Sequence, residues 1–163
     1  MTQIILVMGV SGSGKTTFGT ALAQELNWTF ADADDYHPPA NVQKMASGEA
    51  LTDADREPWL QRLHALIEQH LLEERPLVLA CSALKASYRQ TLTANLEGVN
   101  VVFLNGSREL ISERMNSREH FMPAILLESQ LKTLEPPEDA VLLDVGLPIE
   151  ILVREVMLQL KLD

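Results

Sequence analysis

The chain has 163 residues, of which 46% are hydrophobic, a formal net charge of −10 and one cysteine, Cys81. This length and apolar content predict a single domain with a sizeable core. The negative charge argues against a general nucleic-acid or membrane surface, because either needs a broad positive patch. A lone cysteine excludes an internal disulfide and fits a reducing compartment. We expect a soluble, cytoplasmic protein, since no signal peptide and no membrane-length apolar run is visible.

Short apolar runs alternate with helical patterns along the chain. The first run, residues 4–8, is continuously apolar, which is typical of a strand covered on both faces in a parallel sheet. After it, Phe18, Leu22 and Leu26 recur every four residues and predict a helix that begins at Gly14. The further predicted strands are residues 28–31, 77–81, 101–104 and 141–143, and the further predicted helices are residues 59–72, 83–96, 108–115 and 149–160. This alternation predicts an α/β fold with right-handed crossovers.

Two segments interrupt the alternation. Residues 32–53 are rich in polar and turn residues, and residues 117–137 end in Glu135-Pro136-Pro137, where a helix is unlikely to continue. We interpret both as excursions from the sheet rather than as linkers between domains. The prediction is one domain over residues 1–163, with a substrate-binding excursion near residues 32–58 and a lid near residues 114–137.

Residues 9–16 match the phosphate-loop pattern G-x-x-x-x-G-K-[ST] and stand between a predicted strand and a predicted helix. Glycines let backbone N–H groups converge on the β-phosphate, and the helix N-terminus adds partial positive charge. We expect Lys15 to bridge the β- and γ-phosphates and Thr16 to bind Mg²⁺. ATP is the expected donor, because no guanine-reading motif is visible. The predicted nucleotide-binding residues of this loop are Gly9, Val10, Ser11, Gly12, Ser13, Gly14, Lys15, Thr16 and Thr17.

Acidic residues follow the second predicted strand. They should emerge at the carboxyl edge of the sheet, where ligands bind in open α/β folds. Asp32 and Asp34 would point to opposite sides if the strand continued through them. We assign Asp34 to orient the attacking hydroxyl and accept its proton, and Asp32 to the water shell of the metal. The reverse assignment stays open, as does a loop of solvated acids.

Basic side chains are expected near the same edge. Residues 52–55 offer a cap for the helix that carries Arg56, with Pro58 in its first turn. Lys85 and Arg89 are four residues apart, so a helix would place them on one face, where like charges repel. An anionic ligand between the two side chains would explain the pair, and two solvated side chains are the alternative.

Taken together, these residues resemble the gluconokinase family of P-loop small-molecule kinases. The resemblance covers nearly the whole chain, and its middle motifs are more specific than the phosphate loop. Besides residues 9–16, it rests on Asp32-Ala33-Asp34, His37-Pro38, Asn41, Lys44-Met45, Gly48, Leu51, Asp53, Asp55-Arg56, residues 58–60, residues 81–85, Tyr88-Arg89, Arg118, residues 120–123, Leu126-Leu127, Ser129-Gln130 and residues 133–136. One departure is Thr93, where relatives commonly carry an arginine.

The resemblance implies an adenylate-kinase-like fold, a three-layer sandwich with a central parallel sheet and a lid. It implies transfer of the γ-phosphoryl group of ATP, with Mg²⁺, to the 6-hydroxyl of D-gluconate, and a homodimer. Arg114 is expected at the nucleotide, and Arg118 is expected to join Lys15 and Asp34 in catalysis as the lid closes. The implied substrate-binding residues are Asp34, His37, Lys44, Arg56, Lys85, Arg89 and His120.

Two other interpretations remain open. Shikimate kinases and nucleoside monophosphate kinases share the architecture and have an acid in a similar place, so the acceptor could be another small acid or a nucleotide. A nucleotide acceptor would need an aromatic or amide-lined base pocket, and the sequence offers no clear one. A nucleotide-binding switch without an acceptor is the second interpretation. It would leave Asp34, Lys85 and Arg89 without a role.

Overall fold

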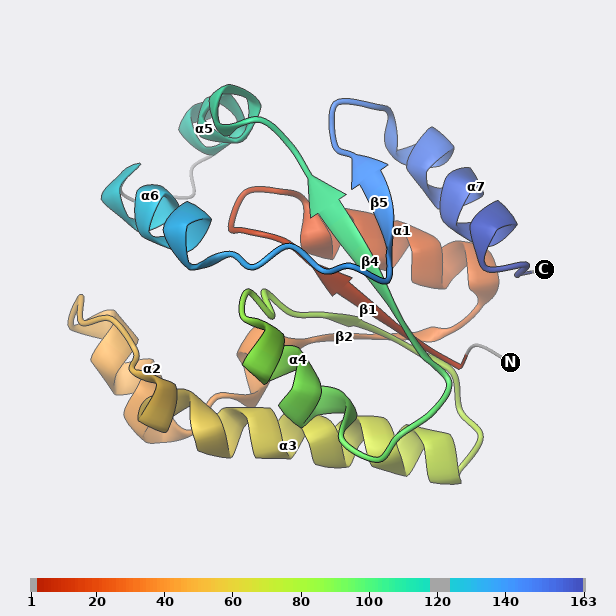
Figure 1. The fold of residues 1–163 in the computed structure, drawn as a ribbon, viewed down its shortest axis with the longest axis horizontal. Helices are drawn as coiled ribbons and strands as arrows, with labels where there is room; N and C mark the ends of the chain where they lie inside the picture. The colour runs from red at the N-terminus through yellow and green to blue at the C-terminus, as the bar shows by residue number, and fades with distance from the viewer. Residues whose placement is uncertain (1–2, 118–123, 163) are drawn as a thin grey trace.

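The residues that the computed structural model describes, 3–117 and 124–162, form a five-stranded sheet (Figure 1). Within these ranges, residues 115–117 and 124–126 are described by their backbone alone. The strands are β1 (Ile4–Met8), β2 (Thr29–Asp32), β3 (Leu77–Ala80), β4 (Val99–Asn105) and β5 (Ala140–Asp144), in the order β2-β3-β1-β4-β5. Each neighbouring pair is parallel. The predicted α/β class with a central parallel sheet is confirmed.

Helices cover both faces of this sheet and complete three layers. Helices α1 (Lys15–Leu26) and α7 (Ile149–Gln159) lie on one face, and α3 (Asp53–Leu72) and α4 (Ala86–Thr93) lie on the other (Figure 1). The remaining elements are η1 (Ala33–Tyr36), α2 (Pro39–Ala46), α5 (Arg108–Ser117) and α6 (Ala124–Thr133). This three-layer arrangement around a parallel sheet is the predicted one.

The central strand β1 contributes to the core on both faces. Ile4, Leu6 and Met8 pack with side chains of α3 and α4, whereas Ile5 and Val7 pack with side chains of α1 and α7. All five residues have 0% exposure, because β1 lies between β3 and β4 and is covered by helices above and below. This explains why β1 reads as a continuous apolar run. The phosphate loop therefore begins from the best-buried strand of the sheet.

Helix boundaries differ from the prediction in two places on the acceptor side. Helix α3 begins at Asp53, directly after a capping box formed by Thr52 and Asp55, so Pro58 lies inside the helix and not in its first turn. The predicted helix 83–96 is shorter, spanning Ala86–Thr93, because Ala83 has a φ of 44° and turns the chain after β3. Left-handed backbone at a non-glycine residue is not visible in a sequence pattern.

The segment predicted as a lid excursion contains helix α6. Its described side chain Leu127 is 2% exposed and packs with Val10, Leu84 and Ile111 in a small third cluster of the core. The sequence analysis did not predict this helix. Among the described residues, no helix combines the length and the apolar content that crossing a membrane would require.

Candidate active site

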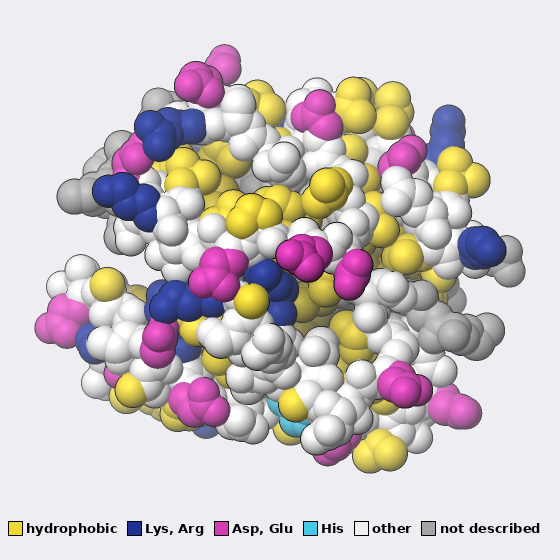
Figure 2. All heavy atoms as spheres, in the orientation of Figure 1, with side chains coloured by type: hydrophobic (Ala, Val, Ile, Leu, Met, Phe, Trp, Pro, Cys, Tyr) yellow, Lys and Arg dark blue, Asp and Glu magenta, His cyan; other side chains and the backbone are white. Residues whose placement is uncertain are grey.

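Three polar segments meet at one edge of the sheet because they follow neighbouring parallel strands. The phosphate loop follows β1, Asp32 ends β2, and the segment leading to Lys85 follows β3, which pairs with both β1 and β2. The carboxyl ends of parallel strands in an open α/β sheet are where ligands bind. Figure 2 shows Lys and Arg side chains gathered beside the hollow between α6 and α2. The fold thus brings the predicted nucleotide and acceptor residues together.

The phosphate loop has the backbone that its sequence predicts. Gly14 has a φ of 98° as the residue preceding α1, a conformation that favours glycine. A Cβ atom at Gly9 would lie 2.6 Å from the Ser13 Oγ atom, so the close approach requires glycine there as well. The Lys15 ammonium donates a hydrogen bond to the Val10 carbonyl at 3.1 Å and is held against the loop. Desolvation lowers the pKa of Lys15, an effect that the carboxylate of Asp34 partly opposes.

Asp34 lies close enough to Lys15 for each charge to influence the other. The Asp34 side chain is open to solvent on one side, yet desolvation by the surrounding protein raises the pKa of its carboxyl group, and the negative charge of Asp32 raises it further. Lys15 acts in the opposite direction and lowers the pKa of Asp34. A carboxylate with a raised pKa is a stronger proton acceptor than an ordinary aspartate. This is the electrostatic setting that a general base requires.

Asp32 and Thr16 form the candidate metal site. The Thr16 hydroxyl donates to Asp32 Oδ2 at 3.1 Å, and the other carboxylate oxygen accepts from the Asp34 backbone N–H at 3.0 Å. Strand β2 ends at Asp32, and the 3₁₀ helix η1 positions Asp34. The strand therefore does not continue through both residues, and strand alternation does not decide which way Asp34 points. Hydroxyl and carboxylate oxygens are hard ligands that fit Mg²⁺, which is held by few protein groups together with phosphate oxygens and waters. No cluster of three or more His, Cys, Asp or Glu that could hold a metal occurs in the described part of the chain.

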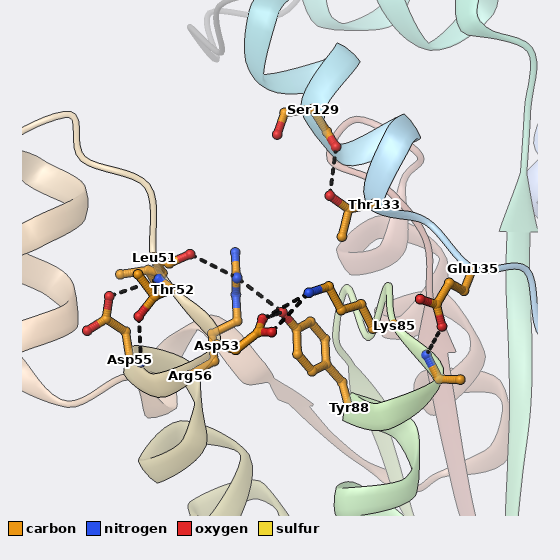
Figure 3. A network of polar contacts seen from close by, with 11 residues as sticks. Leu51, Thr52, Asp53, Asp55, Arg56, Lys85, Tyr88, Ser129, Thr133 and Glu135 are labelled. Carbon is orange, nitrogen blue, oxygen red and sulfur yellow. Dashed lines mark hydrogen bonds and ion pairs between the residues drawn. The ribbon is translucent and has the colours of Figure 1, made fainter.

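The acceptor side contains a connected polar network between the start of α3 and α4 (Figure 3). The Arg56 guanidinium donates to the Leu51 carbonyl at 3.0 Å and to the Tyr88 hydroxyl at 3.2 Å. The Tyr88 hydroxyl donates to Asp53 Oδ1 at 2.5 Å, and Lys85 donates to both Asp53 oxygens at 3.0 and 3.1 Å. Both cations lie over the Tyr88 ring, at 5.6 Å for Arg56 and 5.5 Å for Lys85. Two positive charges and one negative charge therefore converge on one tyrosine.

The protonation of this network follows from its hydrogen bonds. The Tyr88 hydroxyl and the Lys85 ammonium lower the pKa of Asp53. The same carboxylate raises the pKa of Lys85, whereas desolvation, followed by the Asp53 hydrogen bond, raises the pKa of Tyr88. Asp53 is therefore ionised and Lys85 protonated at neutral pH. Arg56 and Lys85 leave a surplus of one positive charge over Asp53, which suits a monocarboxylate.

Arg89 has a different environment from Lys85. Lys85 immediately precedes α4 as its N-cap, so the two side chains are not a pair on one helix face as the spacing predicted. The Arg89 guanidinium donates to the carbonyls of Ala83, Leu84 and Glu135, at 2.7, 3.2 and 2.7 Å. These contacts account for Arg89 without an anion between it and Lys85. Its assignment to the substrate stays a prediction.

His37 and Lys44 are held by neighbouring elements. The His37 ring stacks on Trp59 with centroids 4.4 Å apart, and burial followed by the charge of Arg56 lowers the pKa of His37. Lys44 donates to Asp55 at 2.5 Å, and this bond, before those from Thr52, lowers the pKa of Asp55 to about 2. Among the described residues, neither side chain has a hydrogen bond or an ion pair with Asp34, Arg56 or Lys85. Both remain predicted substrate residues.

The predicted lid residues divide between described and undescribed parts of the chain. Arg114 donates to the Val145 carbonyl, which anchors α5 to the segment after β5. Arg118 and His120 lie outside the described residues. Cys81 is buried, and desolvation raises the pKa of its thiol to about 12, so this thiol is neutral at neutral pH.

The sequence analysis assigned no role to several residues that the structure places in the site. Asp53 and Tyr88 organise the two cations, and Gln130 and Glu135 contact the phosphate loop and the start of α4. Each belongs to a motif that resembled the family, and that was the available signal. Their roles depend on contacts across 32 to 119 residues of sequence, which spacing rules do not reach.

The fold and the site together define a P-loop kinase of a small molecule. They combine a parallel sheet, a phosphate loop with its lysine, a threonine–aspartate pair and an adjoining acceptor network. The family model described as shikimate kinase matches residues 11–138. A gluconokinase of Gluconobacter oxydans is 49% identical over 138 residues, covering 84% of this chain and 78% of its own.

Solved structures agree with this class. A gluconokinase from Sinorhizobium meliloti superimposes with a TM-score of 0.84 at 46% identity, covering 96% of this chain and 90% of that chain. A sugar kinase from Janibacter superimposes with a TM-score of 0.92 at 42% identity, covering 99% and 96%. The chain belongs to the gluconokinase family.

Proposed function

We propose that this protein transfers the γ-phosphoryl group of ATP to the 6-hydroxyl of D-gluconate and yields 6-phospho-D-gluconate and ADP. The observation that carries the proposal is one sheet edge holding a phosphate loop, a carboxylate with a raised pKa and a tyrosine with two cations above its ring. Gluconate has a hydroxyl at one end and a carboxylate at the other, so it needs both kinds of partner. Relatives named as gluconokinases, 49% and 46% identical, support the choice of acceptor.

Each residue has a distinct part in this reaction. Lys15 stabilises the negative charge that develops on the transferring oxygens, and the N–H groups at the start of α1 bind the phosphates. Asp34 accepts the hydroxyl proton as the new O–P bond forms and the bond to ADP breaks. Thr16 and Asp32 would hold Mg²⁺, which would neutralise phosphate charge. Arg56 and Lys85 hold the carboxylate and so orient the distal hydroxyl.

The lid and the oligomeric state extend the proposal. We infer that the part of the predicted lid (residues 114–137) that precedes the packed segment 130–135 excludes water, a competing acceptor, with Arg118 and His120 expected in it. A homodimer in the cytoplasm is the assembly that the family resemblance suggests. Exposed apolar side chains on α7 and the turn before it, namely Leu147, Ile151 and Leu158, have helical spacing and offer a surface for it. Light scattering on Leu158→Glu tests this surface; an unchanged mass would exclude a contact at Leu158.

A coupled assay of ADP release with a panel of acceptors tests the function. Gluconate with Mg²⁺ should give turnover far above that with shikimate, nucleoside monophosphates or water alone. Comparable or faster turnover with shikimate or a monophosphate would replace gluconate as the substrate. ATP hydrolysis that no acceptor stimulates would indicate a switch and not a small-molecule kinase.

A further inference from the structure

Helix α6 contacts both substrate sites from the opposite side of the hollow. Its residue Leu127 is 2% exposed and packs against Val10 of the phosphate loop and Leu84, which leads to α4. Leu131 and Leu134 pack on the same cluster. These apolar contacts fix the position of the last turns of α6. The polar side chains of the same turns then determine which neighbouring segments the helix binds.

Gln130 joins α6 to the phosphate loop by two hydrogen bonds. Its Oε1 atom accepts from the Ser11 backbone N–H at 2.7 Å, and its Nε2 group donates to the Ser11 hydroxyl at 3.1 Å. The two bonds use both ends of the amide, which fixes the orientation of the side chain. The Ser11 N–H is therefore committed to α6, while the N–H groups at the start of α1 remain for phosphate.

Glu135 joins the end of the same segment to the acceptor element. Its carboxylate Oε1 accepts from the Ala86 N–H at 2.9 Å, at the first turn of α4 (Figure 3). Its backbone N–H donates to the Leu84 carbonyl at 2.7 Å, and its carbonyl accepts from Arg89 at 2.7 Å. Lys85 lies between these contacts in the sequence. The position of Lys85, and with it the carboxylate end of the acceptor, therefore depends on Glu135.

We propose that residues 130–135 form a strut that sets the separation between the γ-phosphate of ATP and the acceptor hydroxyl, with Gln130 and Glu135 as positioning residues at its two ends. This inference rests on the proposed gluconate kinase function. A rigid segment held at both ends keeps two separately bound substrates in attack geometry, and small misplacements of reacting atoms lower turnover strongly. Loss of the strut should therefore reduce transfer between the substrates more than the binding of either substrate.

The test compares Gln130→Met and Glu135→Ala with the wild type. We expect kcat for gluconate phosphorylation to fall roughly 10- to 100-fold in each variant, the scale of a small misplacement. The KM values for ATP and gluconate should change less than about threefold, since uniform binding is retained. The share of ATP lost to water, measured as phosphate release against 6-phosphogluconate formed, should rise. A fall in melting temperature with proportionate loss of all activities would overturn the proposal.

Conservative and double variants make the test specific. Glu135→Gln keeps an acceptor for the Ala86 N–H, so it should recover most of the turnover. The double variant Gln130→Met/Glu135→Ala should be about as slow as the slower single variant, because a strut released at either end no longer positions the other. A double variant whose loss of kcat equals the product of the two single losses would contradict a shared strut. Lys132→Gln, exposed on α6 between the two positions, is the matched control and should behave as wild type.

The outcomes separate this inference from the proposed function. A wild-type protein that does not phosphorylate gluconate refutes the function itself. A wild type that does, with variants that keep both turnover and the ratio of transfer to hydrolysis, refutes the strut alone.

Discussion

Replacing Asp34 by asparagine isolates the proton-accepting step. Asparagine preserves the size of the side chain, and the hydrogen bond between Asp34 and Asp32 uses the backbone N–H of Asp34, so η1 should keep its shape. What is lost is a carboxylate whose pKa is raised chiefly by desolvation and then by Asp32. Removing a positioned general base costs roughly 10²- to 10⁴-fold in rate. We expect kcat to fall on that scale.

The pH profile carries the same prediction further. As the pH falls through a raised pKa, Asp34 becomes protonated and can no longer accept the hydroxyl proton. The wild-type kcat should therefore decline on the acid side with a midpoint above the ordinary value of 3.8. In the Asp34→Asn variant this limb should be missing, because the titrating group is gone.

Steady-state kinetics with gluconate and ATP varied separately measure both effects. The KM for gluconate should move less than about threefold, since the lost interaction belongs mainly to the transition state. Asp35→Asn, the exposed neighbour in the same 3₁₀ helix, is the control. It should keep its turnover and still show an acid limb, with the midpoint moved to lower pH because the charge of Asp35 is the smallest of the causes that raise the pKa of Asp34. An Asp34→Asn enzyme with near-normal kcat, or with an unchanged acid limb, would show that Asp34 is not the base.

Four further substitutions test neighbouring parts of the site. Lys15→Ala should lower kcat by about 10²-fold or more, as expected when one preorganised charge is removed, and a folded variant with normal turnover would refute the role of the phosphate loop. Lys85→Ala should raise the KM for gluconate by about 10- to 100-fold without moving that for ATP, because a charge-assisted hydrogen bond is lost. Arg89→Ala should lower the free energy of unfolding by about 2 kcal/mol, measured in urea, since three carbonyls lose their donor. A change in the KM for gluconate with unchanged stability would instead support the prediction that Arg89 binds the substrate. The ion pair with Lys44 stabilises the protein while Asp55 is ionised. This contribution is fully present above the ordinary aspartate pKa of 3.8 and is lost as the pH falls towards about 2. The difference in melting temperature between the wild type and Asp55→Asn should therefore narrow over that range.

The fold was predictable because its signals are local. Each predicted strand matches an observed strand to within a few residues. The signal is strongest for β1 and β3, which are buried along their whole length and therefore read as short, continuous apolar runs. Helix α6 was missed although Leu127, Leu131 and Leu134 have helical spacing, because the prolines after Glu135 led us to interpret the whole segment as an excursion. That error came from extending a local helix-breaking signal backward through the segment.

The site was predictable only in part. The composition of the phosphate loop specifies its backbone, so residues 9–16 could be placed from sequence alone. The acceptor side depends on a turn at Ala83 and on side chains of α3 and α4 that meet in space (Figure 3). The helical spacing of Lys85 and Arg89 suggested a shared anion, but the turn at Ala83 delays α4 until Ala86, and Lys85 then pairs with Asp53. A rule for helical spacing has no meaning until the start of the helix is known.

The two halves of the site differ in how deeply they are anchored, and this has a consequence on heating. The phosphate loop directly follows β1, whose residues are fully buried. On the acceptor side, in residues 33–52, only Ala33 and Asn41 are buried. Segments with few buried contacts open in local fluctuations well below the global transition, while a central strand opens only when the molecule unfolds. Amide hydrogens of β1 should therefore exchange last and those of α2 among the first. As the temperature rises, the affinity for the sugar acid should fall before the affinity for nucleotide does. Binding titrations of each substrate at temperatures just below the melting point would measure the temperature range in which only nucleotide binds.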